Sequence, residues 1–247
     1  MRATCLCVRC CIECGVEMIR FTLFRVQVSI HSSLWVMLVL LGCLFTGVAA
    51  GWAGVALFGV ALFFCLLSHE MGHALVGRWL GGGRPEVFMA WLGGDCCNET
   101  AQLTRWQGVM MTAAGPLASM VLPLVLVWPM IALVVGNVWT GLSITIGFVP
   151  GYVPAELLEV CPPMVLLFGV YLVRICVWWS LLNLLPVYPL DGGRIMHGLM
   201  RSPVSMHRIS LTFACFLLCF FLLLGAWWMV FIMASLALLN YSCMKQE

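Results

Sequence analysis

Two histidines and a glutamate lie close together in the run His69-Glu70-Met71-Gly72-His73. Histidines at positions i and i+4 lie on one face of a helix, about one turn apart, so both imidazoles can bind the same zinc ion. The glutamate after the first histidine can then act as a general base toward a water molecule that the metal activates. This spacing predicts a hydrolytic zinc site on a helix, with His69 and His73 as ligands and Glu70 as the base.

A second run with candidate ligands, NLLPVYPLDGGR, covers residues 183–194. Its two prolines end a helix, and its glycine pair gives the backbone the freedom to turn Asp191 toward a partner. A catalytic zinc needs three protein ligands and one open position, so Asp191 would complete the set with His69 and His73. One divalent cation with the carboxylates of Asp191 and Glu70 is close to neutral, as a buried site requires.

The elements that must hold these side chains are membrane-spanning helices. The chain is 63% hydrophobic and only 9% charged, with a mean hydropathy of +1.07, whereas soluble domains carry about 25% charged residues. A span needs about 20 apolar residues. We therefore expect an all-α polytopic membrane protein with about six transmembrane helices and no soluble domain. The expected spans are residues 34–50, 55–80, 108–135 and 164–185, with two more in 209–239 that divide near Gly225.

The distribution of positive charge predicts the topology of these spans. Arginine and lysine favour the cytoplasmic side of a membrane. They occur before the first span, after the second, after the fourth and after the sixth, whereas residues 136–163 contain none. We therefore expect a multi-pass protein of the inner (cell) membrane with both termini in the cytoplasm. We divide it into a cytoplasmic, cysteine-containing segment at 1–30 and a transmembrane catalytic core at 31–247.

Other residues that could bind a metal have simpler explanations. Five cysteines between positions 5 and 14 could hold a metal, but they could also belong to a disordered tail or precede a true start at Met18. His31 precedes the first span and is expected to be structural. His197 and His207 lie among arginines in a predicted cytoplasmic connection, so we expect both to be solvated.

The chain resembles the site-2 proteases, a family of intramembrane zinc metalloproteases, and specifically the compact bacterial branch that includes the enzyme that processes a sporulation pro-sigma factor. The resemblance covers residues from about 24 to about 200. It implies that His69, His73 and Asp191 bind one catalytic zinc, that Glu70 is the general base, and that Asn183 positions the substrate or its developing oxyanion. The matching motifs are SIH (29–31), HEMGHA (69–74), WLGG (91–94), AGP (114–116), NLLP (183–186) and PLDGGR (189–194).

A short β-hairpin that dips toward the active site is expected after the second span. Residues of the run 84–95 favour strands, and Gly93-Gly94 suits a tight turn. A helical substrate must unwind before hydrolysis, and its freed backbone groups then need partners in a dry setting. We predict that Val87, Phe88 and Met89 contact the substrate, with the edge of the strand at 87–92 pairing with an extended substrate segment.

The predicted function is hydrolysis of peptide bonds in or near the transmembrane segments of membrane proteins. Family precedent suggests a membrane-tethered transcription regulator, an anti-sigma factor or a remnant signal peptide as the substrate, and no nucleic acid is expected to bind. One alternative is a catalytically inactive relative that binds membrane proteins without cutting them. Another is a divalent-metal transporter, which would need a polar path across both leaflets and no glutamate beside the first histidine.

Overall fold

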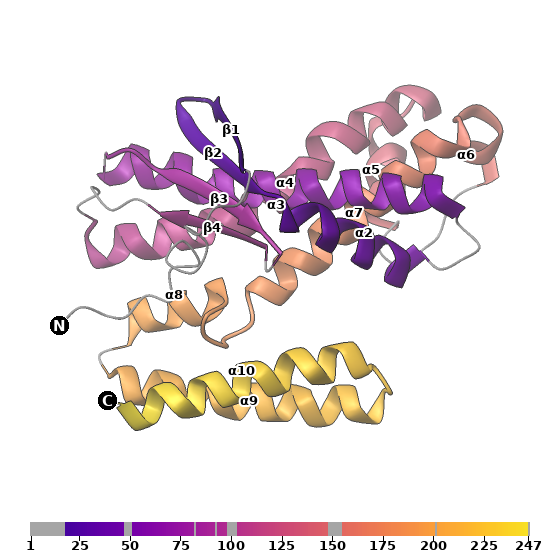
Figure 1. Ribbon diagram of the computed structural model, residues 1–247. Helices are drawn as coiled ribbons and strands as arrows, with labels where there is room; N and C mark the ends of the chain where they lie inside the picture. The colour runs from indigo at the N-terminus through magenta and orange to yellow at the C-terminus, as the bar shows by residue number, and fades with distance from the viewer. Residues whose placement is uncertain are drawn as a thin grey trace.

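The computed structural model describes residues 18–46, 51–81, 83–91, 93–97, 103–147, 155–200 and 202–246. Helices dominate these residues, and a small sheet lies beside them (Figure 1). The helices are α2 (Ser33–Thr46), α3 (Gly51–Gly81), α4 (Arg105–Val135), α5 (Val138–Gly147), α6 (Ala155–Val160), α7 (Pro163–Asn183), α8 (Asp191–Leu199), α9 (Pro203–Leu223) and α10 (Trp227–Gln246). The strands are β1 (Met18–Leu23), β2 (Val26–His31), β3 (Glu86–Ala90) and β4 (Gly93–Cys97).

Five of the described helices are long and apolar enough to cross a membrane: α3, α4, α7, α9 and α10. The prediction of a polytopic, all-α membrane protein is confirmed, and the run 209–239 divides at Gly225 as expected. The first expected span differs, because α2 has 14 residues. At a rise of about 1.5 Å per residue it is shorter than the hydrocarbon layer of about 30 Å. Residues 47–50 of that expected span lie outside the described ranges.

The four strands form one sheet in the order β1-β2-β3-β4. The β3–β4 hairpin confirms the predicted hairpin after the histidine-bearing helix. The β1–β2 hairpin was not predicted, although alternate residues of β2 are apolar and buried, which is the period-2 pattern of a half-buried strand. β2 pairs in parallel with β3, with Val28 opposite Val87. The sheet thereby joins the start of the described chain to the hairpin.

Helix α3 is the centre of the bundle and packs against α2, α4, α7 and β4. Its contact with α4 is very close at Gly72, where a Cβ atom would overlap the backbone carbonyl of Ala114 and approach the Cβ of Ala118 to 2.7 Å. Small residues allow membrane helices to approach in this way. The result is that α4 lies directly against the turn of α3 that carries His69 and His73.

Helices α9 and α10 form a separate antiparallel pair along one flank of the bundle, drawn in orange and yellow in Figure 1. They pack mainly against each other and contact the rest of the protein through α8 and the segment at 184–190. That segment leads from α7 to Asp191. The C-terminal helices therefore lie beneath the part of the chain that delivers the third candidate ligand.

Candidate metal centre

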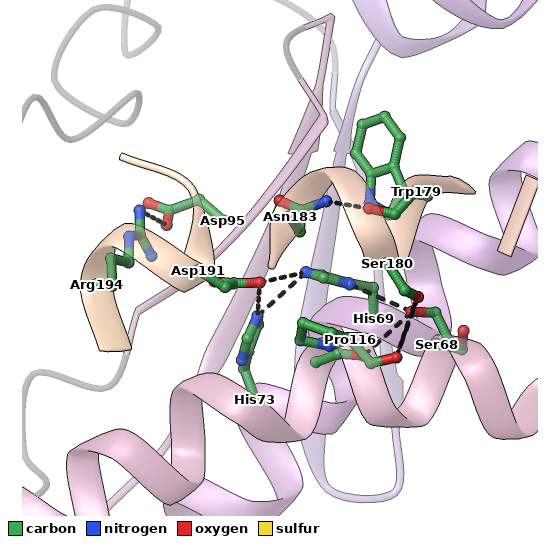
Figure 2. A network of polar contacts seen from close by, with 12 residues as sticks. Ser68, His69, His73, Asp95, Pro116, Trp179, Ser180, Asn183, Asp191 and Arg194 are labelled. Carbon is green, nitrogen blue, oxygen red and sulfur yellow. Dashed lines mark hydrogen bonds and ion pairs between the residues drawn. The ribbon is translucent and has the colours of Figure 1, made fainter. Parts of the chain in front are cut away.

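Three buried side chains converge on one point between α3 and α8 (Figure 2). His69 Nε2 lies 2.9 Å from Asp191 Oδ2, and His73 Nε2 lies 3.4 Å from the same oxygen. The two Nε2 atoms are 3.3 Å apart. No more than 6% of the surface of any of the three residues is exposed. The structure thus brings together the three residues that the sequence analysis selected as ligands.

Local structure explains this convergence. His69 and His73 are one turn apart on α3, whereas Asp191 is the first residue of α8. The segment before Asp191 folds tightly onto α8. A Cβ at Gly192 would overlap the Leu184 carbonyl, and one at Gly193 would overlap the Tyr188 nitrogen. The glycine pair is therefore needed for close backbone packing, which holds the start of α8 against the end of α7.

The imidazole of His73 is oriented by the backbone of α4. Its Nδ1 lies 2.9 Å from the Met111 carbonyl oxygen, and a carbonyl can only accept a hydrogen bond. Nδ1 therefore carries the proton, and the lone pair of Nε2 points at Asp191. A Cβ at Gly115 would overlap the His73 ring, so this position on α4 must be glycine for the ring to fit. Such a partner fixes the tautomer of a metal-binding histidine.

Two buried serines, Ser119 and Ser180, lie beside the other histidine, His69. Ser119 Oγ lies 3.4 Å from His69 Nδ1 and 2.7 Å from Ser180 Oγ, and Ser180 Oγ donates to the Pro116 carbonyl at 3.1 Å (Figure 2). With Ser119 donating to Ser180, its oxygen is free to accept from His69 Nδ1–H, which leaves Nε2 unprotonated. Neither serine was predicted from the sequence, although polar residues within apolar spans are a signal of function.

The donor set fits a metal ion. In the described part of the chain, the buried Asp191 Oδ2 has no hydrogen-bond donor, and both neighbouring Nε2 atoms present lone pairs to it. An ionised carboxylate and two neutral imidazoles are suitable zinc ligands.

Glu70 lies next to these ligands and is also buried, with 5% of its surface exposed. Strand β4 covers it so closely that a Cβ at Gly94 would overlap the Glu70 side chain. Both residues line a cavity that also contains the three candidate ligands. A second acidic residue, Asp95, lines the cavity from β4 and lies 3.9 Å from Arg194 of α8. This pair links the sheet to α8 beside the metal centre.

The predicted substrate-contacting residues have different environments. Asn183 lines the cavity, and its Nδ2 donates to the Trp179 carbonyl at 3.0 Å. Val87, Phe88 and Met89 do not line it. They belong to β3, which pairs with β2 on one side and β4 on the other. The prediction that β3 offers a free edge to the substrate is wrong, because β2 and β4 occupy both of its edges.

Two further expectations concern residues outside the centre. His31 Nδ1 lies 2.7 Å from Ser33 Oγ near the start of α2, so it has the structural environment that was expected. The cysteines at positions 5–14 lie outside the described residues, so metal binding there stays a prediction.

Comparison with known proteins gives a consistent assignment. The model of peptidase family M50 matches residues 57–224. The protein sll0528 of Synechocystis sp. (strain ATCC 27184 / PCC 6803 / Kazusa), named as a candidate zinc metalloprotease, is 28% identical over 138 residues. These residues are 56% of this chain and 30% of that relative, so the chain matches less than a third of the relative's length.

A solved structure gives the same result at the level of the fold. The site-2 protease from Methanocaldococcus jannaschii superimposes with a TM-score of 0.51 and 20% sequence identity, covering 94% of this chain and 95% of that one. At this identity the similarity concerns the fold. The family match extends over more than half of the chain and includes both runs that supply the converging ligands. The protein therefore belongs to peptidase family M50, the site-2 protease family.

Proposed function

We propose that this protein is an intramembrane zinc metalloendopeptidase that cleaves membrane proteins in or near their transmembrane segments. The observation that carries the proposal is the convergence of His69, His73 and Asp191 beside the buried Glu70. The two histidines and the glutamate belong to α3, one of the membrane-spanning helices. Burying several ionisable side chains at this position costs free energy unless they are paired or bind an ion, so such a set marks a functional site.

The ligands would hold one zinc ion through His69 Nε2, His73 Nε2 and an oxygen of Asp191. The bound zinc would supply a Lewis acid that polarises water and the scissile carbonyl. The Glu70 carboxylate takes a proton from the attacking water while the water oxygen bonds to the carbonyl carbon. The C–N bond then breaks, and the proton passes from Glu70 to the leaving nitrogen.

Asn183 is proposed to position the substrate. An asparagine amide has two N–H groups, and one of those on Asn183 is used by the Trp179 carbonyl. The second N–H can donate to a substrate carbonyl in the cavity that Asn183 lines. Because Asn183 ends α7, the backbone of that helix fixes the direction of the amide. This role requires no contact with the metal.

The substrate is therefore proposed to pair with β4 instead of β3. Strands β1 and β4 are the outer strands of the described sheet, and Gly94 and Asp95 of β4 line the cavity next to Glu70. An extended peptide that adds to β4 would therefore have its backbone beside the general base. Val87 and Met89 of β3, which are fully buried, would support β4 from behind instead of contacting the substrate.

The substrate is proposed to be a single-span membrane protein. A membrane-tethered transcription regulator, an anti-sigma factor or a remnant signal peptide would suit a site that lies on membrane-spanning helices. The protein is proposed to lie in the inner membrane, with both termini in the cytoplasm, because positive residues cluster in the corresponding segments.

The zinc ligands are tested by substitution. The purified wild-type protein is expected to hold about one zinc ion, because the three donors serve a single site. His69→Ala, His73→Ala and Asp191→Ala should each lose most of it, as measured by elemental analysis. Full zinc content in Asp191→Ala would remove that residue from the ligand set.

The role of Glu70 is tested by separating metal binding from chemistry. Glu70→Gln retains the size and hydrogen bonding of the side chain but removes the base, so zinc should stay while cleavage falls by about 100-fold or more. Zinc content and cleavage of one model membrane substrate are measured on the same sample. Cleavage at the wild-type rate would show that Glu70 is not the base, and absence of cleavage by the wild type on any membrane substrate would favour an inactive relative.

The substrate-binding edge is tested by disulfide cross-linking in the Glu70→Gln background, which retains uncut substrate. Cys97 of β4 is kept as the only cysteine, and a single cysteine is moved along the substrate around its cleavage site. We expect cross-links at alternate substrate positions, because successive side chains of a strand point to opposite faces. The matched control has its only cysteine at Thr22→Cys in β1, the other outer strand. Cross-links at position 22 in place of 97 would contradict the proposed edge.

The topology is tested by labelling single cysteines from either side of the membrane. Positions 84 and 245 should react from the cytoplasmic side and position 159 from the opposite side, because arginine and lysine mark the first two segments and are absent around the third. Labelling of 159 and 245 from the same side would contradict this orientation.

A further inference from the structure

A buried polar cluster joins the segment before Asp191 to the C-terminal helices. It consists of His207 and Ser210 from α9 and Asn240 from α10, of which 5%, 0% and 0% of the surface is exposed. The expectation that His207 is solvated is therefore wrong. The sequence places it among arginines, but helix α9 already begins at Pro203, so His207 lies within a helix that packs against α10.

The hydrogen bonds of Asn240 define the cluster. Its Nδ2 donates to the Tyr188 carbonyl at 2.6 Å and to the Leu236 carbonyl at 2.8 Å. Both amide hydrogens are thus used, and Oδ1 is left to accept from His207 Nδ1 at 3.0 Å. Two carbonyl acceptors therefore fix the orientation of the amide, and the amide fixes the proton of His207 on Nδ1. The Asn240 side chain has a partner for each of its polar atoms.

Tyr188 is held through both of its backbone polar groups. Its carbonyl accepts from Asn240, and its N–H donates to Ser210 Oγ at 3.1 Å. The Tyr188 ring also meets the His207 ring edge to face, with the centroids 5.4 Å apart. Two membrane-spanning helices therefore bind one residue of the segment that connects α7 to α8.

Apolar packing surrounds these bonds. Val187 is fully buried against Ala214 of α9 and Ala237 of α10, and Leu185 and Leu190 pack around the same contact. Alanines on both helices allow the segment to lie close to them. Polar and apolar contacts thus hold four residues of this segment against the α9–α10 pair: Leu185, Val187, Tyr188 and Leu190.

The position of Tyr188 is transmitted to Asp191 by direct contact. The Tyr188 nitrogen leaves no room for a Cβ at Gly193, two residues beyond Asp191. The Leu190 N–H donates to the Val187 carbonyl at 2.9 Å, and the Arg194 N–H donates to the Leu190 carbonyl at 3.0 Å. These bonds connect the held residue to the first turn of α8. A shift of Tyr188 would therefore move Asp191 relative to the two histidines.

We propose that Asn240 and His207 are positioning residues for Asp191, and that the α9–α10 pair thereby sets the geometry of the metal centre. The inference rests on the proposed function in taking zinc as the ion that Asp191 binds. Residues that orient a metal ligand from outside the ligand set change metal affinity by about 10- to 100-fold when they are replaced. Asn240 acts at a greater distance, through the segment at 184–190.

The test measures zinc affinity of the full chain in detergent, by competition with a zinc chelator. Asn240→Leu keeps a similar volume but removes all three hydrogen bonds, and it should weaken zinc binding by about 10-fold. His207→Leu removes one bond and should give a smaller loss, whereas His207→Asn should restore affinity because its amide nitrogen can donate where Nδ1 did. The matched control is Ser242→Ala on α10, whose hydroxyl donates to Leu238 of the same helix, and it should bind zinc like the wild type.

A double substitution distinguishes positioning from general destabilisation. In the Asp191→Ala background, Asn240→Leu should change the residual zinc affinity by less than roughly two-fold, because Asn240 acts through Asp191. An equal loss in both backgrounds, or wild-type affinity in Asn240→Leu and His207→Leu, would overturn the proposal.

Amide hydrogen exchange tests the same link without metal. In the zinc-free protein, Asn240→Leu or His207→Leu should speed exchange at the Leu190 and Arg194 amides, whereas Ser242→Ala should not. Unchanged exchange in both variants would overturn the proposal even if the wild type bound no zinc. Absence of zinc from the wild type would count against the proposed function instead, so the two failures are distinguishable.

Discussion

The structure depends on three lone pairs that point at one another in a buried, largely apolar setting. His69 Nε2, His73 Nε2 and Asp191 Oδ2 lie within 3.4 Å of each other, and all three belong to buried side chains. An unsatisfied buried polar atom costs about 1–3 kcal/mol, and more when it is charged. A bound cation would satisfy all three, and much of the surrounding packing serves to keep these atoms together.

Each of the three donors is held by a different part of the fold. The Met111 carbonyl on α4 orients His73, and the serine pair contacts His69 from α4 and α7. The segment that runs over α9 and α10 carries Asp191. This division explains the tight contacts made by glycines on α3, α4 and α8, since four helices must approach one point. A change in any of these helices can therefore alter the candidate metal centre through the atoms that contact its side chains.

The sequence was sufficient to predict the three residues that converge and most of the spans, because those depend on local spacing and on runs of apolar residues. A pair of histidines one turn apart needs only a helix, and Asp191 is marked by its glycines and prolines. The parallel pairing of β2 with β3 was missed because it joins residues far apart in the chain. The burial of His207 was missed for the same kind of reason, since its partner Asn240 is 33 residues away. Such pairings depend on tertiary packing, which local patterns do not record.

The error over β3 has a specific physical origin. The pattern around Val87 correctly indicates a strand, but a strand can offer an edge to a substrate only if the sheet ends there. β2 occupies one side of β3, and β4 occupies the other. The Gly-Gly pair at the start of β4 then has a further use beyond the turn: Gly94 lets an outer strand lie directly against Glu70. The absence of a side chain there allows the backbone of β4 and the Glu70 carboxyl group to line one cavity together with Asp191.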